Sequence, residues 1–229
     1  MKIKLVYTTE SMKEKQKMKE KVKEFIVKNL KWIILFICLI GFLAIAEDVF
    51  NKEIMNGDII GYKLISTFLI SDFATPIAKF ITNFGGAIFL TILTIILFIL
   101  IKNKKIGVSI FSNLAIITAL NQLLKNILQR PRPTEYRIIE ETGYSFPSGH
   151  SMISMAFYGY LIYLIYKYVK NKYVKWTSMV LLSLLICSIG ISRIYLGVHY
   201  TSDVLGGFLI SISYLVIYIS AVNKFLIEK

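Results

Sequence analysis

Long runs of apolar residues, separated by short charged segments, limit the fold of this chain more than any other feature. Hydrophobic residues make up 55% of the 229 residues, and the mean hydropathy is +0.62. Several runs approach or exceed the roughly 20 residues that an α-helix needs to cross a bilayer. A soluble domain of this length carries more charge and shorter apolar runs. We therefore predict an all-α fold, a polytopic integral membrane helical bundle.

The apolar runs predict about six transmembrane helices. They cover residues 30–46, 84–101, 106–128, 148–166, 176–192 and 203–222. Residues 49–83 are also apolar, but charged residues and a proline interrupt them: Asp58, Lys63, Asp72, Pro76 and Lys79. For this segment we expect an additional amphipathic helix that lies at the membrane interface or dips into it. A further full span is the alternative.

Lysine and arginine residues gather on one side of the predicted spans. The first 31 residues, the loops 102–105 and 167–175 and the C-terminal tail hold 19 of the 27. Cytoplasmic loops of membrane proteins carry an excess of these residues. We therefore expect both termini in the cytoplasm, and the connections 129–147 and 193–202 on the outer side.

The N-terminal segment differs in composition from the rest of the chain. Residues 11–24 are rich in Lys and Glu, which predicts a solvated helix or a frayed tail near anionic lipid. Nucleic-acid binding is excluded, because the lysines interleave with glutamates and not with aromatic residues. No removable signal peptide is evident. We expect residues 1–29 to be a basic cytoplasmic segment, and residues 30–229 to be one six-span membrane domain.

Three polar clusters interrupt the hydrophobic pattern. They lie at residues 125–133, around 147–150, and at 192–203. In the predicted topology the first closes one span, the second opens the next, and the third joins the last two. All three therefore lie at the outer ends of spans and can form one site at one membrane face.

The clusters contain three cations, Lys125, Arg132 and Arg193, with few acids nearby in the sequence. Such cations repel one another when they are brought together, and a bound phosphate removes that repulsion. Gly149 lies in the sequence Pro-Ser-Gly-His that precedes an apolar helix, where free amides and the helix dipole favour an anion. Cations at the headgroup level and an ordinary helix start are the alternative interpretations.

The two histidines of the chain, His150 and His199, both lie in these clusters. His199 and Asp203 are four residues apart, so on a helix they share a face and the carboxylate can orient the imidazole. That arrangement makes the other ring nitrogen nucleophilic. His150 is suited to donate a proton. A capping Asp203 and an interfacial His199 are the alternative.

Together the clusters read Lys-x6-Arg-Pro, Pro-Ser-Gly-His and Ser-Arg-x5-His-x3-Asp, in that order. This pattern resembles the type 2 phosphatidic acid phosphatase superfamily, which includes membrane lipid phosphatases, soluble acid phosphatases and vanadium haloperoxidases. The resemblance implies that His199 attacks phosphorus, that Asp203 orients His199, and that His150 protonates the leaving group. It also implies a phosphate-binding set: Lys125, Arg132, Ser148, Gly149 and Arg193. The sequence has no acidic metal-binding cluster near these motifs, and three cations can stabilise the phosphate instead. We therefore expect no metal, no cofactor and no obligate protein partner.

The expected function is hydrolysis of a lipid phosphomonoester, of the phosphatidic acid or phosphatidylglycerophosphate type, through a phosphohistidine at the outer face of a bacterial plasma membrane. The expected partners are this lipid phosphate and the membrane lipids. An undecaprenyl pyrophosphate phosphatase on the same scaffold is the alternative. A non-enzymatic lipid-binding or transport protein is a more remote one.

Overall fold

The computed structural model describes the backbone of residues 2–52 and 55–224, and within these ranges the side chains of residue 16 and of residues 18 onward. This part of the chain forms eight helices and no strand. The helices are α1 (Lys2–Phe50), α2 (Asn56–Phe68), α3 (Ala74–Asn83), α4 (Ala87–Leu100), α5 (Lys104–Leu128), α6 (Gly149–Tyr168), α7 (Lys172–Tyr195) and α8 (Thr201–Val222). The all-α prediction is confirmed for the described residues.

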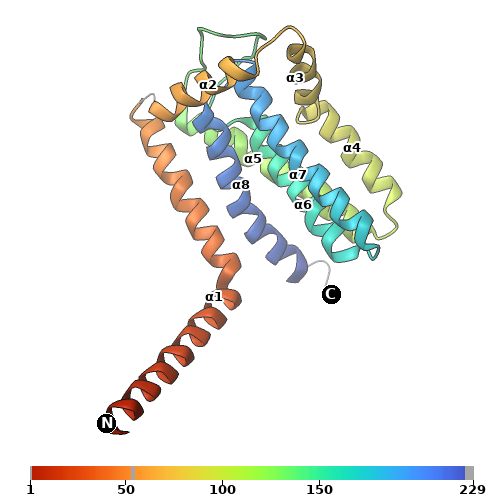
Figure 1. Cartoon of the computed structure of the whole chain (residues 1–229). Coiled ribbons are helices and arrows are strands. Elements are labelled where there is room, and N and C mark those ends of the chain that lie inside the picture. Colours follow the sequence, from red (N-terminus) through yellow and green to blue (C-terminus); the bar gives the residue numbers. More distant parts are fainter. Residues whose placement is uncertain (1, 53–54, 225–229) are drawn as a thin grey trace.

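Helix α6 lies at the centre of the bundle, in contact with α5, α7 and α8 (Figure 1). α1 packs against the outer side of α8, and α4 packs against α5. α6 carries several tyrosines, and the hydroxyls of its two most buried ones have partners inside the bundle. Tyr158 donates to the Phe84 carbonyl and Tyr160 to Ser109 Oγ, each at 2.7 Å. These bonds let polar side chains lie in an otherwise apolar core.

Four helices are long and apolar enough to cross a membrane: α1 from Met18, α5, α7 and α8. A fifth span arises if α3 and α4, which meet at an angle of 49°, are taken as one broken span. α6 is not among these helices, because its polar first turn and its five tyrosines lower its hydropathy. The structure therefore supports a membrane bundle without confirming the expected count of six.

The segment 49–83 differs from the single amphipathic helix that the sequence predicts. It contains the end of α1 and two separate helices, α2 and α3, of 13 and 10 residues. At about 1.5 Å per residue neither is long enough to cross a bilayer alone. The predicted span 84–101 also differs, since its helix, α4, begins only at Ala87.

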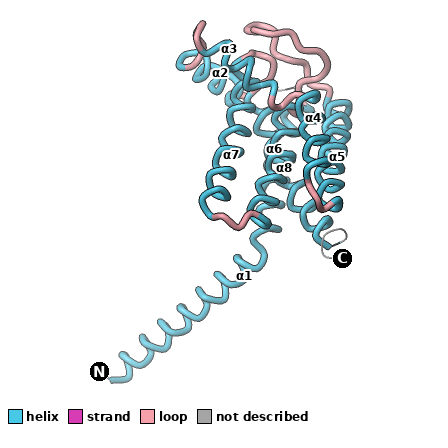
Figure 2. The backbone as a smooth tube through the Cα atoms, turned by 90° about the vertical axis from the view of Figure 1, so that its right-hand side faces the viewer, coloured by secondary structure: helices cyan, strands magenta, loops and turns pink. Residues whose placement is uncertain are grey.

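The two ends of the bundle have connections of different length. Short turns, residues 101–103 and 169–171, join helices at the end toward which the N-terminal part of α1 projects (Figure 2). The opposite end carries α2, α3 and the long connection 129–148. All three polar clusters lie at this second end.

Candidate active site

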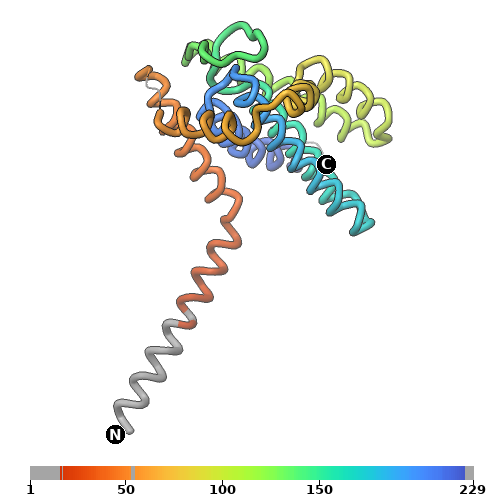
Figure 3. Tube along the Cα trace, turned by 45° about the horizontal axis from the view of Figure 1, so that its top comes forward, coloured from red at the N-terminus to blue at the C-terminus, as the bar shows by residue number. Residues whose placement is uncertain are grey.

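The three polar clusters meet at one end of the bundle, as the sequence predicts. Ser148 N–H donates to the Asp203 carbonyl at 3.1 Å, which joins the second cluster to the third. Arg132 Nη1 lies 3.0 Å from His199 Nε2, which joins the first cluster to the third. Viewed from this end, α2 and the connection 129–148 lie on either side of the turn between α7 and α8 (Figure 3).

His199 lies in the turn before α8, so it does not share a helical face with Asp203 as the sequence predicted. The helix begins at Thr201, and Asp203 is in its first turn. Asp203 Oδ2 lies 3.3 Å from His199 Nδ1 and also accepts the Tyr200 backbone N–H at 2.8 Å. Asp203 therefore caps α8 and contacts His199 with the same oxygen. Contact with His199 and capping of the helix, which the sequence analysis gives as alternatives for Asp203, therefore occur together.

Ser145 completes the environment of the His199–Asp203 pair. Its hydroxyl donates to Asp203 Oδ2 at 2.5 Å and lies 3.2 Å from His199 Nδ1. These neighbours favour the tautomer in which Nδ1 carries the proton and the Nε2 lone pair accepts from Arg132 Nη1 at 3.0 Å. Burial lowers the pKa of His199 to about 4, in spite of the opposing influence of Asp203. The imidazole is therefore neutral at pH 7, as a nucleophile must be.

Lys125, Arg132 and Arg193 form the cation cluster. Arg193 is only 1% exposed, and its Nη1 donates to Thr82 Oγ1 at 2.8 Å. Its Nε is buried and has no hydrogen-bond partner among the described residues. Lys125 lies within electrostatic range of both arginines. A buried guanidinium with an unused N–H is suited to bind an anion.

The sequence has few acids near the three cations, but the fold brings one acid, Glu141, against them. Glu141 Oε1 is 2.5 Å from Arg193 Nη2, and Oε2 is 4.0 Å from Arg132 Nη2. Burial acts to raise the pKa of Glu141, but the Arg193 guanidinium outweighs it and the pKa falls below its ordinary value. Glu141 is thus a carboxylate at neutral pH. It belongs to a loop without periodic pattern, so this contact could not be predicted from the sequence.

The first turn of α6 lies beside the cation cluster. Ser148 caps the helix by accepting from Ser151 N–H at 3.5 Å and from Ser151 Oγ at 3.0 Å, which leaves its own O–H free to donate. A Cβ on Gly149 would lie 4.0 Å from Lys125 Cε. His150 lies within electrostatic range of Arg193 and His199. The N-terminal amides of α6, His150 and the cations thus lie around one region.

Gly85, in the break between α3 and α4, packs closely beside His150. A Cβ there would lie 3.3 Å from His150 Cδ2 and 2.8 Å from Ser154 Oγ and Ile189 Cγ2. A residue with a side chain would therefore displace its neighbours. This break fixes one wall of the region around His150.

Arg130 and Asp58 were not singled out from the sequence, yet both hold Asp203 in place. Arg130 donates to Asp203 Oδ1 and to Asp58 Oδ2, each at 2.7 Å, and all three side chains are at most 5% exposed. The Arg130 guanidinium also lies 4.1 Å from the centre of the Tyr200 ring. Arg130 lies in the first polar cluster, two residues before Arg132, so its position in the sequence could have indicated a place near the site. Asp58 is far away in the sequence, and nothing there connects it to this cluster.

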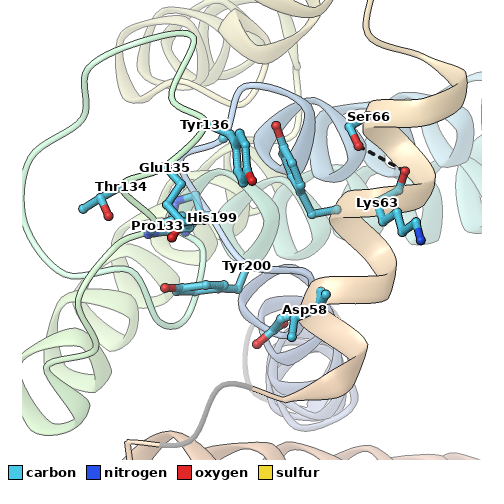
Figure 4. Close-up of a pocket in the computed structure, with 12 residues that line it drawn as sticks. Asp58, Lys63, Ser66, Pro133, Thr134, Glu135, Tyr136, His199 and Tyr200 are labelled. Atoms are coloured by element: carbon cyan, nitrogen blue, oxygen red, sulfur yellow. Dashed lines mark hydrogen bonds between the residues drawn. The ribbon is translucent and has the colours of Figure 1, made fainter.

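A cavity of about 760 Å³ opens between α2 and the connection 129–148 and reaches His199 (Figure 4). Tyr62 and Tyr136, whose rings stack at 4.8 Å, lie in its wall together with Tyr200. None of the three cations lines it. The cavity thus reaches the candidate nucleophile, although the cation cluster does not line it.

Comparisons with known proteins agree with this arrangement. The sequence model described as the PAP2 superfamily matches residues 106–227. Phosphatidylglycerophosphatase B of Bacillus subtilis (strain 168) is 40% identical over 91 residues, which span 39% of this chain and only 44% of that protein. Undecaprenyl-diphosphatase of Sulfolobus acidocaldarius is 26% identical over 195 residues, which span 80% of this chain and 86% of that protein.

Two solved structures share the fold. The crystal structure of a transmembrane PAP2 type phosphatidylglycerolphosphate phosphatase from Bacillus subtilis has a TM-score of 0.71 and 26% identity, over 83% of this chain and 96% of that chain. LpxE from Aquifex aeolicus has a TM-score of 0.58 and 25% identity, over 69% and 92% of the two chains. The match to the transmembrane phosphatase extends well beyond the three clusters.

Proposed function

Because this chain belongs to the PAP2 superfamily of phosphatases, we propose that it hydrolyses a lipid phosphomonoester at the membrane surface, of the phosphatidic acid or phosphatidylglycerophosphate type. The observation that carries the proposal is the geometry of His199. Its Nδ1 faces Asp203 at 3.3 Å, and its Nε2 lies 3.0 Å from Arg132. A neutral imidazole is thus oriented with its lone pair toward a cation that binds phosphate.

The proposed reaction has two steps. His199 Nε2 attacks phosphorus, the bond from phosphorus to the lipid oxygen breaks, and His150 gives its proton to the leaving alkoxide. Water then attacks the phosphohistidine, His150 takes a proton from the water, and inorganic phosphate leaves. Phosphoryl transfer depends mainly on positioning and on stabilising charge. The cation cluster, the Ser148 hydroxyl and the Gly149 amide supply that stabilisation.

We further propose that six spans cross the membrane, with α6 as one and the α3–α4 pair as another. Both termini are then cytoplasmic, and the active site faces the outer side of a bacterial plasma membrane. The lysine-rich loops 102–105 and 167–175, which contain the two short turns, support this orientation. A lipid can then diffuse laterally with its chains in the bilayer while its phosphate reaches the site.

An undecaprenyl diphosphate is the second candidate substrate. The similarity to the Sulfolobus acidocaldarius protein, which extends over 80% of this chain, favours it. The residues of the site bind phosphate oxygens and do not contact the hydrocarbon tail. Both substrates therefore fit the same catalytic groups, and an assay has to distinguish them.

Phosphate release by the purified protein in detergent tests the function. Phosphatidic acid, phosphatidylglycerophosphate and undecaprenyl diphosphate are offered in parallel, with and without EDTA. We expect release from at least one of them, and the same rate in EDTA, because fixed cations provide the electrostatic stabilisation. Loss of activity in EDTA would contradict the metal-independent mechanism. No release from any substrate would favour a binding or transport role.

Replacing His150 with alanine tests the general acid. With lipid substrates we expect the rate to fall by about 10²- to 10⁴-fold, the usual contribution of a proton donor. With 4-nitrophenyl phosphate the first step should fall far less, because that leaving group needs no proton. The rate of the first step is measured for both substrates as a burst of released leaving group. Equal losses would show that His150 has another role.

A further inference from the structure

One short segment of the connection 129–148 bonds all three members of the cation cluster. Arg132 donates to the carbonyls of Thr142 and Gly143, each at 3.0 Å. Lys125 donates to the carbonyl of Tyr144. Arg193 binds the carboxylate of Glu141. Residues 141–144 therefore use the donors that a bound phosphate needs.

Glu141 is the charged member of this segment, and its geometry resembles that of a phosphoryl group. One oxygen lies 2.5 Å from Arg193 Nη2 and the other 4.0 Å from Arg132 Nη2. Two oxygens of one anion thus face two guanidinium groups. A phosphoryl group bridging the same two arginines occupies the same space. Phosphate and the Glu141 carboxylate therefore exclude each other, and a substrate has to displace Glu141.

The charge of the incoming group decides whether that exchange is favourable. A phosphodiester carries a single negative charge, so replacing Glu141 with it leaves the charge in the cluster unchanged. Glu141, meanwhile, loses two cationic partners. A phosphomonoester carries about −1.5 to −2 at pH 7 and has three terminal oxygens. It can replace the carboxylate and also neutralise Lys125. Its exchange for Glu141 is therefore favourable, whereas that of the phosphodiester is not.

We propose that Glu141 is a specificity-determining residue, which reserves the cation cluster for phosphate groups that carry more than one negative charge. The proposal rests on the phosphatase function proposed above. It matters at a membrane surface, because anionic phosphodiester lipids present their headgroups to the same cations. Without a competing carboxylate, those lipids occupy the cluster and inhibit the enzyme.

Inhibition in mixed micelles tests the proposal, with phosphatidic acid as substrate and phosphatidylglycerol as the phosphodiester. Detergent dilution to the same surface fraction is the reference. For the wild type, phosphatidylglycerol should inhibit no more than dilution. In Glu141→Gln its inhibition constant should fall by about 10- to 100-fold relative to the KM of the substrate, the range of a charge-assisted hydrogen bond. An unchanged ratio would overturn the proposal.

Glu140→Gln is the matched control. Glu140 is the neighbouring residue, is 91% exposed, and pairs with Arg137 at 3.7 Å. The same substitution there should leave unchanged both the inhibition constant of phosphatidylglycerol and the KM of phosphatidic acid. A shift in Glu140→Gln equal to that in Glu141→Gln would show that the effect is one of general surface charge, and would also overturn the proposal.

A binding measurement separates this proposal from the catalytic one. Inorganic phosphate and dimethyl phosphate, a soluble phosphodiester, are compared for the shift that they cause in the Tm of the detergent-solubilised protein. The wild type should be stabilised by inorganic phosphate alone, and Glu141→Gln by both. Equal stabilisation of the wild type by both anions would overturn the proposal even if the variant failed to fold. Discrimination without any turnover would refute the phosphatase function and leave the specificity of the cluster intact.

Discussion

Replacing His199 with alanine should lower turnover by about 10⁴-fold or more, the scale expected when an enzyme loses its nucleophile. The side chain is 3% exposed, and Asp203, Ser145 and Arg132 surround its ring. The Nε2 lone pair, which faces Arg132 Nη1 at 3.0 Å, is lost with the imidazole. Water would have to attack the phosphate directly, without the orientation that the imidazole has.

The chemical intermediate provides the sharper measurement. With labelled phosphatidic acid, the reaction is stopped rapidly in alkaline detergent. Label on the protein that is stable in base and lost in acid would reveal phosphohistidine. His150→Ala is the matched control, because the chain contains only these two histidines. With 4-nitrophenyl phosphate that variant should accumulate the intermediate, since the base for the second step is missing. A labelled protein in His199→Ala would eliminate this residue as the nucleophile.

Replacing Arg130 with methionine should destabilise the protein by about 3–5 kcal/mol, the loss expected when one partner of a buried ion pair is removed. Arg130 stands between Asp58 and Asp203, at 2.7 Å from each. Its removal leaves two buried carboxylates without their cation. Thermal unfolding in detergent measures the effect.

Two further variants make this measurement specific. Arg137→Met removes an arginine of the same connection whose acidic partner is 91% exposed, and the loss of that ion pair should cost less than about 1 kcal/mol. Adding Asp58→Asn to the Arg130 variant should recover part of the stability, because it removes one of the stranded charges. Equal losses in the two arginine variants would show that Arg130 has no special part in the fold.

The sequence predicted the long helices well where apolar runs end in clear charges. α5, α7 and α8 follow the expected spans within a few residues, because basic residues and polar clusters mark their ends. It also predicted that Lys125, Arg132, Arg193 and the two histidines share one end of the bundle. Alternating spans bring such clusters to one face whatever the details of packing.

The contacts that complete the site were not predictable, because they depend on tertiary structure. Glu141 lies in a connection with no helical period. Asp58 lies in α2, but nothing in the sequence of that helix shows that it packs against the clusters. In the segment 49–83, residues 69–73 separate α2 from α3. The hydropathy of the sequence alone does not reveal that break. His199 precedes α8 for a similar reason: Asp203 caps the helix and so fixes where it begins.

The unequal lengths of the connections at the two ends of the bundle have a consequence for how enzymes of this kind diverge. The residues proposed to react, His150, His199 and Asp203, lie on helix ends or in the tight turn between α7 and α8. Glu141 and part of the cavity wall belong to the connection 129–148. Insertions and substitutions are tolerated best in such long surface connections. Substitutions or insertions in this connection can therefore change the lipid specificity, while the residues on the helices that carry the reaction stay the same.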